Sequence, residues 1–223
     1  MNIVFIHGIA GSKRNFTLLQ KHFPDSLAFD LIGYGQEKKP NVTYDSALFI
    51  RFLEKKIPKK KEITLVGHSL GAILAKEYAL KHKVKKVILI NYPFRKEKVK
   101  THWFYSHYIK QSPMAKLMCQ SKHLWKYPLF PFFFIFYHKY FNSFVDYFKH
   151  TYRSASSSIR DTILKDDNRS LEKLKNKCII ISGDKDCLLD QKETAKYKHY
   201  LIKDMGHNFF GHEEEIAEII NAS

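Results

Sequence analysis

Cysteine is scarce in this chain of 223 residues, which contains three. Cys119, Cys178 and Cys187 form no C-x-x-C pair and no other spacing that is typical of a metal site. A sparse set of odd number is typical of reduced thiols. The sequence therefore predicts a cytoplasmic protein without a disulfide framework and without a bound metal. At this length a single large core can form without either device.

Long apolar runs are also missing. The first apolar stretch, residues 2–6, is too short for the core of a signal peptide, and no cleavage site follows it. The most apolar stretch, residues 129–137, is far shorter than the roughly 20 residues that a membrane-spanning helix needs, and we expect Pro131 to interrupt it. We therefore expect neither a signal peptide nor a transmembrane segment.

Acidic residues are few relative to basic ones: 38 Lys and Arg stand against 22 Asp and Glu, a net charge of +16. The sequence contains no helix-turn-helix, zinc-finger or RNA-recognition signature. Its positive charge is then the only feature that favours nucleic-acid binding, and we expect no nucleic-acid partner. Two interpretations remain open. The lysines can form an ordinary solvated surface, or they can attract an acidic partner, such as an acyl carrier protein, or an anionic membrane.

Apolar strands alternate with amphipathic segments along both ends of the chain. This alternation indicates βα units and a parallel sheet, and so the α/β fold class. Strands are expected at residues 2–6, 27–29, 63–66, 84–90, 177–182 and 197–202, and helices at 13–23, 45–56, 72–80 and 213–220.

The alternation stops between two of these strands. Aromatic residues crowd residues 93–160, most densely between 130 and 137. The pattern predicts an α/β core formed by residues 1–92 and 161–223, interrupted by an inserted segment at residues 93–160. The aromatic part is expected to form a lid, which could enter a membrane interface; the alternative is that it packs over the core.

The pentapeptide Gly67-His68-Ser69-Leu70-Gly71 lies between the expected strand at 63–66 and the expected helix at 72–80. Strand, G-x-S-x-G and helix together predict a nucleophile elbow, a tight turn that raises the serine hydroxyl above the sheet edge. Only small residues fit beside such a turn, which explains Gly67 and Gly71. Ser69 is the candidate nucleophile.

A serine hydroxyl needs a base within hydrogen-bond reach, and the base needs an orienting carboxylate. Asp186 follows the strand at 177–182, at the sheet edge where loops after parallel strands converge. It is the candidate acid. Asp184 and Asp190 are its rivals.

The candidate base is His207, in the loop between the last strand and the last helix. Its runner-up, His212, is expected at the start of that helix. His68 lies beside the nucleophile in the sequence and is expected to support the site rather than to act as the base.

Stabilising an oxyanion requires two convergent N–H groups. One is expected from Leu70, the residue after the nucleophile. The other is expected from Ile9 in the loop His7-Gly8-Ile9-Ala10-Gly11, where Gly8 allows the backbone to approach the substrate closely. His7 and Gly8 are therefore candidate substrate-binding residues, although the pair could simply form a turn at the end of a strand.

Over nearly its full length the chain resembles serine hydrolases of the α/β-hydrolase fold, of the carboxylesterase and lipase type. Five segments carry the resemblance, in the order found in that family: His7-Gly8-Ile9-Ala10-Gly11, Asp30-Leu31-Ile32-Gly33-Tyr34-Gly35, Gly67-His68-Ser69-Leu70-Gly71, Gly183-Asp184-Lys185-Asp186 and Gly206-His207.

The resemblance implies a mostly parallel sheet with helices on both faces and a helical cap inserted after the strand that ends at Ile90. The two strands that usually begin this fold have no counterpart here, so we expect a trimmed sheet of about six strands. The resemblance also implies that Ser69 is the nucleophile, Asp186 the acid and His207 the base. Asn91 occupies the position where some members carry the acid, which strengthens the assignment of Asp186.

The expected activity is hydrolysis of a carboxylic ester with an apolar portion, without a cofactor. The basic surface and aromatic cap resemble those of pimeloyl-carrier-protein methyl ester esterases, so a carrier-linked substrate is one version. The alternatives are a lysophospholipase, monoacylglycerol lipase or thioesterase at a membrane, and a non-catalytic binding protein of the same fold.

Overall fold

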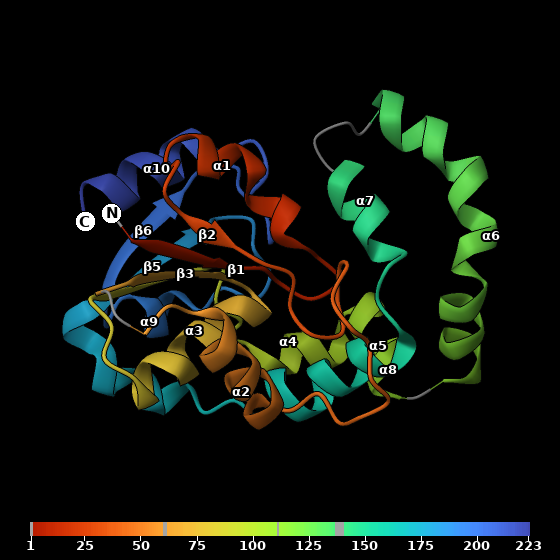
Figure 1. Cartoon of the computed structure of the whole chain (residues 1–223), viewed down its shortest axis with the longest axis horizontal. Coiled ribbons are helices and arrows are strands. Elements are labelled where there is room, and N and C mark those ends of the chain that lie inside the picture. The colour runs from red at the N-terminus through yellow and green to blue at the C-terminus, as the bar shows by residue number, and fades with distance from the viewer. Residues whose placement is uncertain (1, 60–61, 111, 137–140) are drawn as a thin grey trace.

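The computed structural model describes residues 2–59, 62–110, 112–136 and 141–223. Its centre is one sheet of six strands, all parallel, in the order β2-β1-β3-β4-β5-β6 (Figure 1). The strands are β1 (Ile3–Ile6), β2 (Leu27–Ala28), β3 (Thr64–His68), β4 (Lys86–Ile90), β5 (Cys178–Gly183) and β6 (Lys198–Ile202). The trimmed parallel sheet expected from the sequence is confirmed.

The strands are apolar on both faces because both faces of the sheet are covered. In β1, Ile3 and Phe5 join one buried cluster, whereas Val4 and Ile6 join the other, as the twofold period of a strand requires. Figure 1 shows α1 and α10 on one side of the sheet and α2 and α3 on the other. These helices are α1 (Thr17–Lys21), α2 (Ser46–Lys56), α3 (Leu70–Lys81) and α10 (Glu213–Asn221).

The chain between residues 13 and 23 differs from the single helix expected there. It forms a 3₁₀ turn, η1 (Lys13–Phe16), followed by α1. Ser12 and Asn15 form a capping box, in which the Ser12 side chain accepts from backbone N–H groups of the turn and Asn15 accepts from the Ser12 N–H at 3.2 Å. This local hydrogen bonding fixes the tighter turn.

Between β4 and β5 the chain forms α4 (Lys96–Thr101), α5 (Trp103–Ile109), α6 (Pro113–Phe136), α7 (Phe141–Tyr147), α8 (Tyr152–Ser157), η3 (Ser158–Ile163) and η4 (Asn168–Lys177). We call residues 93–160 the inserted segment, keeping the boundaries predicted from the sequence. The interruption expected at Pro131 is wrong, because α6 continues through both Pro128 and Pro131. Tyr137, the last residue of the aromatic run, lies outside the described residues.

Most described side chains of the aromatic run are exposed and do not pack over the core. In Figure 1, α6 stands apart from the sheet at the far side of the inserted segment. Within the described ranges, none of the helices is both long and apolar enough to cross a membrane.

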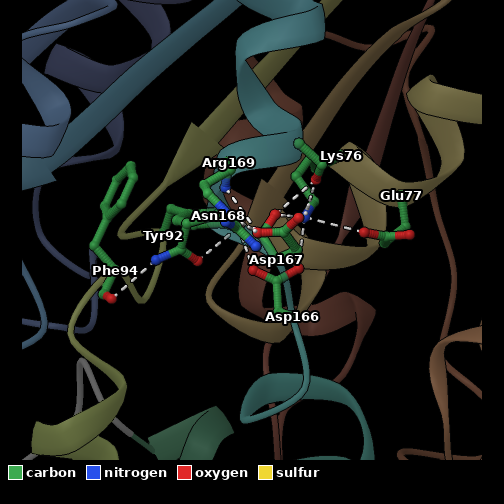
Figure 2. Close-up of polar contacts among 9 residues, drawn as sticks. Lys76, Glu77, Tyr92, Phe94, Asp166, Asp167, Asn168 and Arg169 are labelled. Atoms are coloured by element: carbon green, nitrogen blue, oxygen red, sulfur yellow. Dashed lines mark hydrogen bonds and ion pairs between the residues drawn. The ribbon is translucent and has the colours of Figure 1, made fainter.

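A buried lysine of α3 joins the stretches of chain that flank the inserted segment (Figure 2). Lys76 has no exposed side-chain surface, and its Nζ lies 2.6 Å from Asp166 Oδ1, 3.0 Å from Glu77 Oε1 and 2.9 Å from Ser170 Oγ. Tyr92, two residues after β4, donates its hydroxyl hydrogen bond to the same Asp166 carboxylate. Burial next to this carboxylate raises the pKa of Tyr92. The chain leaving β4 and the chain returning to β5 are therefore fixed to the helix that begins beside Ser69.

Candidate active site

Ser69 occupies the turn between β3 and α3 in a backbone conformation that L-residues rarely adopt, with φ 55° and ψ −115°. Its N–H donates to the Ile90 carbonyl at 3.0 Å, which anchors the turn to β4. Such a strained non-glycine residue costs about 1–3 kcal/mol and is typical of active sites. The first turn of α3 also leaves backbone N–H groups without helical partners beside Ser69. The local geometry is that of a nucleophile elbow.

Replacing Gly71 with alanine is expected to destabilise the protein by at least about 2 kcal/mol. A Cβ at this position would overlap the carbonyl oxygens of Ile6 and His7, which belong to backbone that cannot move aside. Gly206→Ala is the matched control, since a Cβ there meets nothing within 4 Å. Urea unfolding of the two variants measures the difference; equal midpoints would contradict the steric argument.

The structure brings Asp186 and His207 to Ser69. His207 Nε2 lies 2.9 Å from Ser69 Oγ, and His207 Nδ1 lies 3.1 and 3.0 Å from the two carboxylate oxygens of Asp186. Because an ionised carboxylate only accepts hydrogen bonds, Nδ1 carries the proton, and Nε2 is left to accept from the serine hydroxyl.

Asp186 is suited to remain ionised although it is buried. Burial raises the pKa of its carboxyl, but His207 and the Leu188 N–H, which donates at 2.9 Å, outweigh this effect and hold the pKa below its ordinary value. Its rivals lie elsewhere: the Asp184 side chain is exposed, and Asp190 caps a short helix, α9 (Gln191–Thr194). His212 lies at the start of α10, with Nδ1 3.8 Å from Glu215.

Two side chains fix the loop that carries His207. Asn91 donates through Nδ2 to the carbonyls of Gly206 at 3.0 Å and His207 at 2.8 Å, and its Oδ1 accepts from the Gly183 N–H at 2.9 Å. His68 donates through Nε2 to the same His207 carbonyl at 2.8 Å. Burial lowers the pKa of His68 to about 3, so its ring is neutral at physiological pH. The residue in the alternative acid position thus holds the acid and base loops together.

His7 does not line the pocket at Ser69 among the described residues, unlike Gly8 and Ile9. Its Nε2 accepts from the Leu31 N–H at 2.9 Å, so its Nδ1 donates to the Gly8 carbonyl at 2.8 Å. Both nitrogens therefore serve to position the loop, and the substrate contact expected of His7 is not what this geometry provides. Asp30 accepts from the Lys13 N–H at 2.8 Å, at the start of the turn η1 that follows this loop.

Gly8 is needed where the loop passes the nucleophile. A Cβ on Gly8 would lie 3.0 Å from His68 Nδ1 and 3.2 Å from the Ser69 Cβ, closer than side chains normally pack. The loop can therefore approach Ser69 only because residue 8 has no side chain. Ile9, the expected second oxyanion donor, lines the pocket next to Ser69, whereas Leu70 is buried in the first turn of α3.

The pocket at Ser69 has a volume of about 230 Å³. The core contributes its loops and His207, and the inserted segment contributes Tyr105 of α5 and Tyr147 of α7. Asn15 and Asn208 also line it. No motif in the sequence marks the two tyrosines or the two asparagines as pocket residues. The abundance of aromatic residues in the inserted segment is the only sequence feature that bears on the tyrosines.

Asp146 of α7 holds the inserted segment against the loop beside Ser69. Its side chain is fully buried. It accepts from Ser12 Oγ and the Arg14 guanidinium, which lie outside the inserted segment, and from Lys149 Nζ at 3.1 Å. No local pattern in the sequence predicts this contact, since Ser12 and Arg14 lie more than 130 positions from Asp146.

A parallel sheet that presents a strained serine between a strand and a helix, with a histidine and a carboxylate from later strand ends beside it, defines the class of α/β-hydrolase-fold proteins. A model described as "Alpha/beta hydrolase family" matches residues 3–219, so the chain belongs to this family.

The chain is similar to individual relatives over part of their length. It is 38% identical over 109 residues to the probable lysophospholipase BODYGUARD 2 of Arabidopsis thaliana, covering 43% of this chain and 23% of that protein. It is 35% identical over 101 residues to the 1-acylglycerol-3-phosphate O-acyltransferase of the same plant, covering 40% of this chain and 24% of that protein. The chain thus spans about a quarter of the length of either relative.

Among solved structures, an esterase from Exiguobacterium antarcticum superposes with a TM-score of 0.71 and 19% identity, covering 100% of this chain and 91% of that one. At this identity the likeness concerns the fold.

Proposed function

We propose that the protein is a serine hydrolase that cleaves carboxylic esters with an apolar portion. The observation that carries the proposal is the unbroken hydrogen-bonded series from Ser69 Oγ through His207 to Asp186, with heavy-atom separations of 2.9 and 3.0 Å, at the edge of a pocket. These distances lie in the range that nucleophile activation by a base requires.

The proposed reaction has two halves. Ser69 Oγ attacks the acyl carbon while His207 Nε2 takes its proton, and the Ile9 and Leu70 N–H groups stabilise the oxyanion. His207 then returns the proton to the leaving alkoxide, and an acyl ester on Ser69 remains. Water attacks this ester with His207 again as base, which releases the carboxylic acid and restores the serine. Asp186 keeps the imidazole in the required tautomer and stabilises its charged form.

The substrate portion near Ser69 is proposed to be apolar because Ile9, Tyr105 and Tyr147 line the pocket and no acidic or lysine side chain does so among its described lining residues. A lysophospholipid or monoacylglycerol is the second candidate, supported by the exposed apolar surface of α6 and by the similarity to the probable lysophospholipase of Arabidopsis. A carrier-protein-linked methyl ester remains a prediction that rests on the basic surface.

A fluorophosphonate probe and a substrate panel test the proposal on the purified chain. The probe is expected to label Ser69, as read by peptide mass spectrometry, and label should be lost after heat denaturation. The panel contains p-nitrophenyl esters of increasing acyl length, an acyl thioester, a lysophospholipid, a monoacylglycerol and a carrier-linked methyl ester. Hydrolysis of esters without labelling of Ser69 would refute the assignment of Ser69 as the nucleophile. No labelling and no turnover of any substrate would refute the enzyme and favour a binding protein.

A further inference from the structure

Exposed apolar side chains are concentrated on one helix. The described residues include eleven large apolar side chains that are exposed, and eight of them lie on α6. The exposed fraction reaches 64% for Leu117, 65% for Leu124 and 77% for Tyr127. Single exposed apolar residues are ordinary, but a cluster on one element marks a surface that is covered by something else.

The placement of these side chains along α6 indicates what covers them. In its first half, α6 buries one face, with Ala115 and Cys119, and exposes the other, with Leu117 and Leu124. Towards its end, Leu129, Phe130, Phe132, Phe134 and Ile135 are all exposed, between 40% and 64%. Consecutive helical residues differ in direction by about 100°, so these five side chains point to all sides of the helix. A groove on a protein covers one face of a helix, whereas a lipid surface surrounds an inserted end.

The charge of this region selects the kind of lipid. Between Glu97 and Asp146 the sequence contains no acidic residue. Lysines 98, 100, 110 and 116 in this span are exposed and Lys126 is half-buried, whereas Lys122 is buried. Lysines close to an anionic membrane are attracted to its surface. An apolar helix end flanked by lysines alone is complementary to a surface of anionic phospholipid.

The geometry points to α6 as a membrane-docking helix: we propose that residues 129–135 insert into the interface of an anionic phospholipid bilayer while the flanking lysines contact the headgroups. α6 packs against α5 and α7, which carry Tyr105 and Tyr147 of the pocket. Docking through α6 therefore brings the pocket close to lipid. The proposal does not depend on the hydrolytic function, because it concerns a surface distant from Ser69 in the chain.

Vesicle flotation of the full-length chain tests this proposal. The vesicles are phosphatidylcholine with or without phosphatidylglycerol. We expect binding to the anionic vesicles, at least about tenfold weaker binding by the triple variant F130S/F132S/F134S, and unchanged binding by L18S/L201S, whose leucines are about half exposed on the core. The Ser69→Ala protein is expected to bind vesicles like the wild type. Vesicle binding can therefore be interpreted even if the protein hydrolyses no ester.

A second variant covers the case in which the triple variant fails to fold. Lys116→Glu combined with Lys126→Glu is expected to weaken binding to the anionic vesicles and to leave hydrolysis of a short soluble ester unchanged. Absence of binding, equal binding by wild type and both α6 variants, or equal binding to both kinds of vesicle would overturn the proposal. So would a dimer in light scattering that the three phenylalanines alone hold together, since α6 would then be covered by a second copy.

Discussion

The Ser69→Ala variant is expected to lose turnover of p-nitrophenyl esters by roughly 10⁴- to 10⁶-fold. Removal of Oγ removes the atom that forms the acyl ester, and neither His207 nor a neighbouring hydroxyl can replace it at the turn. Ser69 is 2% exposed and its side chain contacts His207, so the loss of one oxygen leaves the fold intact. The kinetic constants, measured with active-site titration of the wild type, give the ratio.

The control for this prediction separates chemistry from folding. Ser12 is another buried serine near the site, but its hydroxyl binds Asp146 and not His207. Ser12→Ala is therefore expected to retain labelling of Ser69 by the fluorophosphonate probe, whereas Ser69→Ala loses it. Both variants should show the far-ultraviolet circular dichroism of the wild type. Retention of most ester turnover by Ser69→Ala would remove the nucleophile assignment and the proposed function with it.

The Asp186→Asn variant is expected to lower kcat by about 10⁴-fold with little change in KM. The amide can donate a hydrogen bond to His207 Nδ1, which places the imidazole proton on Nε2, and Nε2 then cannot accept the proton of Ser69. The carboxylate also stabilises the imidazolium that forms during the reaction. Asp186 lies within hydrogen-bond distance of Nδ1 through both oxygens, and among the described residues it is the carboxylate that contacts this nitrogen.

Asp184→Asn is the matched control, two residues away in the same loop. Its side chain is exposed, and the carboxylate beside His207 is that of Asp186. We therefore expect kcat to stay within about twofold of the wild type, as for most substitutions at exposed positions. Stopped-flow or steady-state assays at pH 7 distinguish the two variants. A larger loss for Asp184→Asn than for Asp186→Asn would reverse the assignment of the acid.

Much of the site was predictable because its signals are local or follow from the parallel sheet. The G-x-S-x-G pattern indicates a turn that has no room for side chains at its glycines, and a Cβ on Gly71 would indeed overlap the Ile6 carbonyl. Asp186 and His207 follow β5 and β6, and the carboxyl ends of parallel strands lie at one edge of the sheet. Strand order and loop position therefore sufficed to select them among several acids and twelve histidines.

Other roles could not be assigned from the sequence because they depend on partners distant in the chain. His7 has the same neighbours in sequence whether it contacts substrate or holds the loop, and only the Leu31 N–H at 2.9 Å decides between the two. From the sequence, Asn91 is only a residue that stands where some family members carry the acid. Its three hydrogen bonds to the loops of Asp186 and His207 depend on how β4, β5 and the last loop converge.

The sequence by itself determined the alternation of strands and helices, the parallel sheet and the Ser69 turn, since hydrophobic period and turn chemistry act over a few residues. The tertiary structure decided which side chains of the inserted segment are exposed. Its aromatic run is equally apolar whether it covers the core or faces outward, and only the folded chain shows that Leu117 and Leu124 lie opposite the packed face of α6 and that Phe130, Phe132 and Phe134 are exposed. The buried contact of Asp146 with Ser12 and Arg14 likewise required the folded chain, because it joins residues that have no local reason to meet.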